Sequence, residues 1–240
     1  MNNCVVFQYK GKFAHFLRAE ANSSAPSYPF PSRTVLLGLA GAILGLSKDS
    51  SQEILKDANF AVSGKAETTH WHTANLRKDP PTPISLTIKK SDKGSSKGQR
   101  NTIITQEWLF NPNYTVWTQM PVQYHNEFEQ RIKSRTWHFS PSLGLSEMGA
   151  DLIYLGSHEI VSLKSDFYNI NTVALKKKIE LDLKTALEKN SVIKSLKMPR
   201  NVNDKREFYH EYYCYDVTGK PIYAKTDNAF NIGDNIIMWL

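Results

Sequence analysis

A proline-rich loop that runs directly into a glycine-rich apolar helix constrains this fold most. The loop covers residues 11–32 and holds three prolines, which exclude regular helix there because proline lacks an N–H donor and restricts the residue before it. Ser32 is a favourable N-cap, so we expect a helix from about Arg33 to Leu46. Its side chains are apolar on nearly every side, which predicts a buried helix.

Three glycines, Gly38, Gly41 and Gly45, lie within this helix. Each glycine costs about 1 kcal/mol of helix stability relative to alanine. We therefore expect another backbone to pass very close to the helix, as happens when a helix lies tightly on a sheet.

The other elements predict an α+β fold. A second helix is expected at residues 122–135, and strands at residues 4–7, 60–67, 102–106, 108–117 and 152–155. Over residues 1–156 the resulting order is strand, helix, strand, excursion, strand, helix, strand, which suits a ferredoxin-like (RRM-type) βαββαβ domain. The excursion, about residues 68–105, is expected to be an inserted β-hairpin thumb.

Residues 157–240 are expected to form a smaller, mainly β C-terminal part packed on this domain. Within it, residues 173–189 fit either a helix or a twisted pair of strands, and residues 207–217 and 235–240 are strand-like.

The net charge is unevenly distributed. The chain carries +7 overall with a pI near 9.2. Residues 65–101 hold a net +5 and residues 176–206 a net +6, which leaves the remainder at −4. Two positive blocks on a mildly acidic body indicate contact surfaces for a polyanion.

Several classes of protein fit this sequence poorly. The two cysteines, Cys4 and Cys214, have no metal-ligand spacing, which argues against a disulfide scaffold or zinc ribbon. His70 and His72 would face the same side of a strand, but no third ligand has suitable spacing, so we expect neither a metal nor a cofactor. The sequence also lacks a nucleophile elbow, P-loop, dinucleotide fingerprint or HExxH motif, which weakens the case for a small-molecule enzyme.

The sequence predicts a cytoplasmic protein without membrane contact. We see no basic-then-apolar signal peptide at the start. The longest apolar run, Val35 to Leu46, is well short of the roughly 20 residues that span a bilayer.

Three segments resemble a known family in order and spacing. They are FAHFLRAEANSSAPSYPFPSRTVLLGLAGAILGL (residues 13–46), SPSLGLSEMGADLIYLG (140–156) and, more weakly, TQEWLFNPNYTVWT (105–118). They resemble the opening signature, the Pro-x-Leu-Gly-x-Ser-Glu turn and the Leu-hydrophobic-Asn-Pro-x-Tyr strand pair of the CRISPR-associated Cas-five family.

The resemblance implies an RRM-like domain with a thumb and a smaller C-terminal part. It also implies a subunit of the type I Cascade surveillance complex, closest to the type I-B branch, that caps the 5′ handle of the CRISPR RNA. The implied partners are that RNA, the backbone and large subunits and, at the PAM-proximal end, target DNA.

A guide RNA is gripped by phosphate contacts, base stacking and 2′-hydroxyl contacts, so its binder needs basic and aromatic groups on one face. The proline-rich loop supplies Lys12, His15, Arg18, Tyr28 and Arg33. Arg33 begins a helix, where free N–H groups also favour a phosphate. The alternatives are that Tyr28 fills the core and that Arg33 forms a surface ion pair.

Further RNA-binding candidates come from the thumb and the family-like motifs. The resemblance implies that the thumb folds over the handle, with Trp71 stacking on a base; a solvated loop is the alternative. The Gly144 turn can expose N–H groups to RNA, although a turn that merely needs φ > 0 explains it better. The candidates are Trp71, Arg77, Lys78, Lys89, Lys90, Arg100, Trp108, Asn111 and Gly144.

Two other functions stay open. His15, Tyr28, Lys12 and Arg33 could in principle form a metal-independent endoribonuclease site, as one branch of the family processes precursor RNA with a Tyr/Lys/His cluster. A generic RRM-like interaction module is the other. The basic block at 176–206 can meet nucleic acid or the large subunit, and the sequence does not select residues within it.

Overall fold

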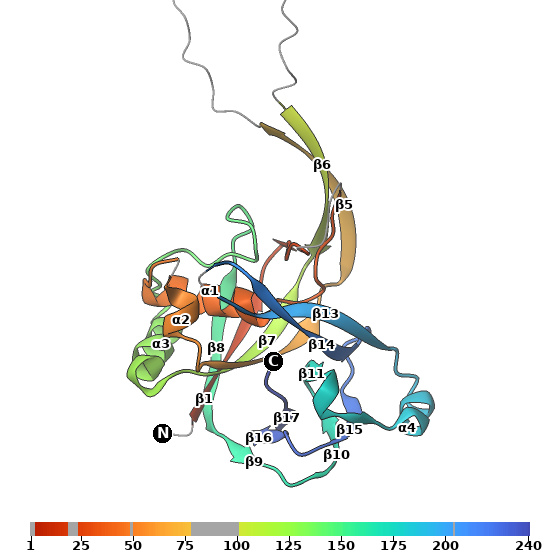
Figure 1. Cartoon of the computed structure of the whole chain (residues 1–240). Helices are drawn as coiled ribbons and strands as arrows, with labels where there is room; N and C mark the ends of the chain where they lie inside the picture. Colours follow the sequence, from red (N-terminus) through yellow and green to blue (C-terminus); the bar gives the residue numbers. More distant parts are fainter. Residues whose placement is uncertain (1–2, 19–23, 49, 78–100, 204) are drawn as a thin grey trace, which may run out of the picture.

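The computed structural model describes residues 3–18, 24–48, 50–77, 101–203 and 205–240 (Figure 1). Of residues 76, 77, 101 and 102 the backbone alone is described. The predictions for Lys78, Lys89, Lys90 and Arg100 therefore lie outside the described residues, as does the side chain of Arg77.

A four-stranded antiparallel sheet forms the centre of the fold, in the order β4-β7-β1-β8. Helices α1 and α3 cover one face of this sheet. Phe128 of α3 packs edge-on against Phe7 of β1, with ring centroids 6.1 Å apart. The bounds are β1 Asn3–Lys10, β4 Asn59–Lys65, β7 Asn113–Gln119, β8 Asp151–Glu159, α1 Arg33–Leu44, α2 Ser51–Ile54 and α3 Val122–Ser134. The fold is thus mixed α+β, dominated by strands.

Helix α1 begins at Arg33 as its sequence predicts, but it ends at Leu44 instead of Leu46, so Gly45 caps the helix and does not lie within it. The Ser32 side chain accepts a hydrogen bond from the Val35 N–H, and Gly45 ends the helix in the left-handed conformation at φ 78°. A Cβ on Gly41 would lie 2.6 Å from Ser51 Cβ, so the close approach is to α2 and not to the sheet. The expectation was wrong for Gly38, where a Cβ would meet nothing within 4 Å.

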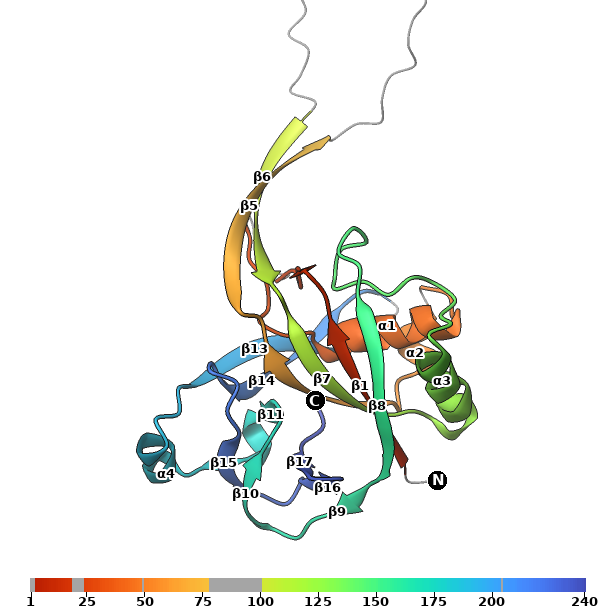
Figure 2. The ribbon, with the colours of Figure 1, turned by 180° about the vertical axis from the view of Figure 1, so that it is seen from behind.

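A long two-stranded hairpin, β5 (Thr68–Arg77) and β6 (Asn101–Phe110), leaves the body as the thumb (Figures 1 and 2). Two short strands from the proline-rich loop, β2 (Phe13–Ala14) and β3 (Ser24–Ala25), pair with β6 near its base. The loop is thereby fixed to the thumb. Tyr114 of the central sheet adds a second attachment, because its hydroxyl donates to Pro29 O over 2.7 Å.

The C-terminal part is built mainly of short strands. Residues 173–189 form neither a single helix nor only a twisted pair of strands. They contain two short strands, a 3-10 turn and a short helix. Its elements are β9 Val161–Ser162, β10 Asp166–Ile170, β11 Ala174–Leu175, η1 Lys176–Lys178, β12 Glu180–Leu181, α4 Leu183–Glu188, β13 Ile193–Val202, β14 Phe208–Asp216, β15 Ile222–Thr226, β16 Phe230–Ile232 and β17 Asn235–Ile237.

This part wraps around the free edge and back of the central sheet (Figure 2). The carbonyls of Phe60 and Val62 on edge strand β4 accept from Leu240 N and Val173 N, at 2.8 and 2.9 Å. Trp117 packs behind the sheet in a cluster with residues from β16 and β17. The edge strand is thereby hydrogen-bonded and shielded. No helix in the described part of the chain is long and apolar enough to cross a membrane.

Candidate nucleic-acid interface

The base of the thumb gathers aromatic and basic side chains on one face. In the register of the β5–β6 pair, His70 lies opposite Trp108 and His72 opposite Gln106, while Phe13 of β2 lies opposite Phe110. Side chains two residues apart on a strand share a face, so these rings lie on the same side of the ribbon.

The rings on this face contact one another in a row. His72 stacks on Trp108 with centroids 4.0 Å apart and planes at 28°, and Phe13 lies 5.4 Å from Trp108. Phe110 follows at 5.6 Å from Phe13. The exposed Lys12 places its Nζ 5.7 Å from the centre of the Phe13 ring. We call His72, Trp108, Phe13, Phe110 and Lys12 the thumb-base face.

This face provides both contacts that a single-stranded nucleic acid needs. Aromatic rings offer surfaces on which bases stack, and an adjacent ammonium neutralises backbone phosphate. Trp108 also has its indole N–H fixed, because Nε1 donates to Gln106 Oε1 over 3.1 Å. The ring is therefore held in place and remains half-buried.

Trp71 does not join this face. It lies opposite Glu107 in the register, on the other side of the ribbon, and its side chain is 52% exposed. From the sequence, Trp71 and Trp108 were grouped as RNA contacts, whereas the structure places their side chains on opposite faces of the β5–β6 ribbon.

Two members of the proline-rich loop lie inside the protein. His15 is 2% exposed and its Nδ1 lies 2.8 Å from Glu107 O, behind the thumb-base face. Tyr28 is also 2% exposed and packs in the main core, as the alternative interpretation held. Arg18 is half-buried, donates from Nε to Ser27 O over 3.0 Å and lies 5.5 Å from the Tyr28 ring. These placements argue against direct RNA contact by His15 and Tyr28.

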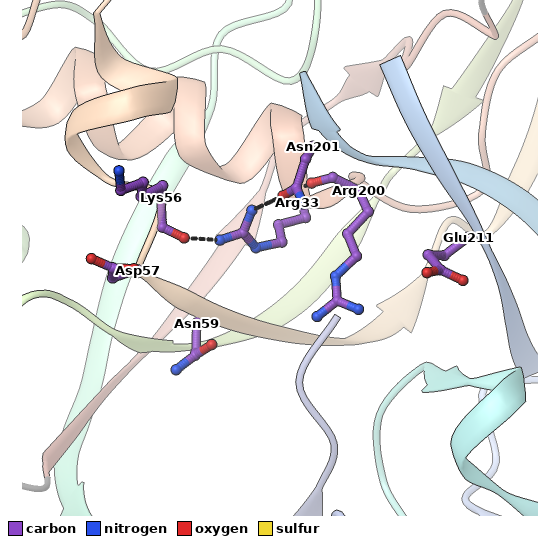
Figure 3. Close-up of a pocket in the computed structure, with 7 residues that line it drawn as sticks. All are labelled: Arg33, Lys56, Asp57, Asn59, Arg200, Asn201 and Glu211. Atoms are coloured by element: carbon purple, nitrogen blue, oxygen red, sulfur yellow. Dashed lines mark hydrogen bonds between the residues drawn. The ribbon is translucent and has the colours of Figure 1, made fainter. Parts of the chain in front are cut away.

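Arg33 lies in a buried corner and not at an open mouth of α1 (Figure 3). Its guanidinium donates to Lys56 O at 2.5 Å, Ala58 O at 2.9 Å and Arg200 O at 3.4 Å, and also to the Asn201 side chain. Burial, and then the nearby Arg200 cation, lower the pKa of Arg33. The residue joins α1 to the start of β4 and to β13.

Its burial and its protein acceptors indicate a structural role for Arg33, and they argue against both the RNA contact and the surface ion pair that the sequence suggested. A hollow of about 390 Å³ lies beside it, lined by both acids and bases, including Arg200 and Glu211. Figure 3 shows the Arg200 side chain reaching into this hollow next to the enclosed Arg33.

Asn111 and Gly144 occupy turns that support the loop. Asn111 adopts φ 46°, donates from its backbone N–H to Lys12 O over 2.9 Å, and bonds through its amide to Glu67. Gly144 has φ 100°, and a Cβ there would lie 1.9 Å from His15 O. A turn that requires φ > 0 therefore explains the glycine at position 144 without any RNA contact.

Lys12 and Trp108 were expected RNA contacts from the sequence, and His72 lies in the expected thumb, but Phe13 and Phe110 were not expected. The sequence did contain a signal for Phe110. Gln106, Trp108 and Phe110 are alternate residues of one strand and therefore share a face. The pairing of Phe13 with that strand joins residues almost a hundred positions apart and has no local signature.

The four side chains considered for RNA cleavage do not meet in one open site. His15, Tyr28 and Arg33 are buried, while Lys12 is exposed on the thumb-base face. Among the described residues no group of three or more His, Cys, Asp or Glu is placed to hold a metal ion.

Comparison with known proteins identifies relatives of this chain. The model of the family described as "CRISPR-associated protein (Cas_Cas5)" matches residues 4–206. A comparison with the curated proteins returned no match.

Two solved structures resemble the fold over nearly its full length. A chain of a "CRISPR RNA-guided surveillance complex" has a TM-score of 0.53 at 13% identity, covering 92% of this chain and 91% of its own. A CRISPR protein from Archaeoglobus fulgidus has a TM-score of 0.52 at 16% identity, with coverages of 98% and 97%. At these identities the likeness establishes the fold alone.

Proposed function

The chain belongs to the CRISPR-associated Cas-five family, and from that membership we propose that it is a non-catalytic RNA-binding subunit of a CRISPR effector complex. In this proposal it caps the 5′ handle of the guide RNA in a type I Cascade assembly of the cytoplasm. The observation that carries it is the thumb-base face, where stacked rings and Lys12 lie together at the base of a protruding hairpin.

The geometry suggests how the handle is held. An unstacked base lies on the exposed part of the Trp108–Phe13 row, and Lys12 meets the adjoining phosphate. Asn111 fixes the backbone of Lys12, and the Gly144 turn supports the loop from behind. These two residues act by positioning the loop, with no RNA contact of their own.

The proposal also covers the architecture. The antiparallel order β4-β7-β1-β8, with α1 and α3 on one face, supports a ferredoxin-like arrangement of residues 1–156. Residues 157–240 would then be the smaller part, wrapped around the edge of that domain. The type I-B assignment remains a proposal that rests on sequence style.

Other subunits are the natural protein partners. One structural neighbour is a chain of an RNA-guided surveillance complex, which supports contacts with backbone and large subunits here too. Contact with target DNA near the PAM-proximal end is proposed as the consequence of such a position.

Trp108→Ala tests the function directly. Loss of one stacking ring should weaken binding of repeat-derived 5′-handle RNA by about 1–3 kcal/mol, measured by fluorescence anisotropy on the full chain. Trp239→Ala is a control ring, because Trp239 packs on Phe230 in the C-terminal part. If the wild-type chain and the complex containing it fail to retain handle RNA, the proposed function is wrong.

A cleavage assay addresses the endoribonuclease alternative. Excess protein incubated with repeat RNA in EDTA should leave the RNA intact. Specific cleavage at one site of the repeat would replace the non-catalytic role with an enzymatic one.

A further inference from the structure

A second exposed surface, far from the thumb in sequence, lies on the hairpin β13–β14. Phe208, His210 and Tyr212 occupy alternate positions of β14 and therefore share one face of the strand. Phe208 is 46% and Tyr212 54% exposed, and the Phe208 and His210 rings lie 6.4 Å apart.

Two lysines are added to this row by the neighbouring segments. Strand β14 lies between β11 and β13 in a three-stranded sheet. Lys197 of β13 pairs with Tyr212 in the register, and Lys176, just after β11, places its Nζ 5.9 Å from the centre of the Tyr212 ring. We call Phe208, His210, Tyr212, Lys176 and Lys197 the β14 strip.

Alternation along β14 separates the strip from the acid beside it. Glu211 points to the other face and is ion-paired with Lys177. At the Phe208 end the strip opens into a hollow of about 770 Å³, lined also by Lys48, Arg206 and Glu53. The surroundings of the strip are thus mainly cationic, in agreement with the net +6 of residues 176–206.

Further along β14, the same face is used for packing. Cys214 is 2% exposed and lies in a cluster with Ile222 and Ala224 of β15. The strip is therefore the uncovered end of a face whose other end forms a core, and its rings have no covering layer among the described residues.

We propose that the β14 strip is a second contact site for single-stranded RNA, separate from the thumb-base face. This inference rests on the proposed function, because it extends the path of the RNA across the C-terminal part. Rings with interleaved lysines suit stacked bases and phosphates. The centre of a protein–protein interface is depleted in lysine, so the composition favours RNA over a protein partner.

The arrangement of the strip also suits stacking. The ammonium of Lys176 lies 5.9 Å from the centre of the Tyr212 ring and places positive charge beside it. Lys197 projects from the same face of the adjacent strand. A base stacked on the free side of the Tyr212 ring would place its phosphate within reach of the two lysines.

Tyr212→Ala is the deciding variant, and the strand supplies its own control. Tyr209 is 59% exposed on the opposite face of β14, towards Arg33 and Leu37. With the full chain and labelled single-stranded repeat RNA, Tyr212→Ala should weaken binding by about fivefold to a hundredfold. Tyr209→Ala and Tyr212→Phe should stay within about twofold of the wild type.

Lys197→Gln gives an independent readout. Because single-stranded binding follows log salt with a slope of about −0.7 per neutralised phosphate, this variant should reduce the slope by roughly that amount. Circular dichroism checks that each variant is folded, which is expected because the altered side chains are exposed.

The results separate this inference from the function on which it rests. If Trp108→Ala weakens RNA binding while Tyr212→Ala behaves like Tyr209→Ala, the strip is not an RNA site and the proposed function stands. If the wild type binds no RNA, both fail. In the assembled complex, ultraviolet crosslinks from residues 208–212 to guide RNA support the proposal, whereas crosslinks only to another subunit or to target DNA overturn it.

Discussion

The thumb base and the α1 corner place the same chemistry in opposite settings. Each place holds a cation from the proline-rich segment or from the residue that follows it. Lys12 is exposed beside Phe13, whereas Arg33 is 7% exposed and donates to backbone carbonyls. The difference shows that burial and acceptor supply, more than residue type, decide whether a cation is available to a ligand.

The side chain at each place suits its setting. A guanidinium presents five donors in a plane and can satisfy several fixed carbonyls together, as Arg33 does at Lys56, Ala58 and Arg200. An ammonium is a compact charge on a flexible stem, which suits a solvent-facing phosphate contact at Lys12.

The largest expected effect is on stability at the α1 corner. Arg33→Ala removes the guanidinium that donates to Lys56 O and Ala58 O. We expect the free energy of unfolding to fall by about 2–4 kcal/mol, measured by urea denaturation. RNA affinity of the folded protein should remain within about twofold.

Arg135 provides the matched control for this experiment. Its side chain is 58% exposed and forms a surface ion pair with Asp151. Arg135→Ala should therefore cost at most about 1 kcal/mol. Equal stability of the Arg33 and Arg135 variants, or lost RNA binding in a fully stable Arg33 variant, would break the contrast between the two regions.

A smaller effect is expected at the turn behind the loop. Gly144→Ala requires a side chain at φ 100° and brings its Cβ against His15 O, so we expect a loss of about 1–3 kcal/mol in unfolding free energy. Gly149, in the same turn, has open space around a built Cβ. If Gly149→Ala destabilises the protein as much, the close approach at Gly144 is not the cause.

Local signals predicted the two longer helices, although α1 ends at Leu44 instead of Leu46 and the short helix α2 was not expected. Ser32 and Gly45 bound α1 as capping chemistry requires, and α3 occupies residues 122–134 of the expected 122–135. The strands β1, β4, β7 and β8 were each expected. The observed β1 and β8 are longer than expected, and the ends of β4 and β7 are displaced from the expected positions. These elements carry periodicity and caps within a few residues, which a single sequence displays.

The site was only partly predictable because its decisive contacts are distant in sequence. From the sequence, Arg33 looked available to a phosphate. The groups that accept its hydrogen bonds lie at residues 56–58 and 200–201, too far along the chain to be recognised from the residues around Arg33. Likewise, the ring row requires β2 to pair with β6. Of the C-terminal strands, β14 and β17 were expected at residues 207–217 and 235–240. Most of the others were missed for a similar reason, because they are two to five residues long and are fixed by packing on other parts of the chain.

The smallest expected effect, and the sharpest test of the comparison, is at Lys12. Lys12→Ala should weaken handle-RNA binding about twofold to fivefold and reduce the slope of log affinity against log salt by about 0.7, because one phosphate contact is lost. Unfolding free energy should change by no more than about 0.5 kcal/mol, since the side chain is exposed. Lys225→Ala, an exposed lysine on β15 in the C-terminal part, removes the same charge away from the thumb base. If both variants shift the affinity and the slope alike, the protein attracts RNA through its overall charge, and Lys12 is no different from any other surface cation.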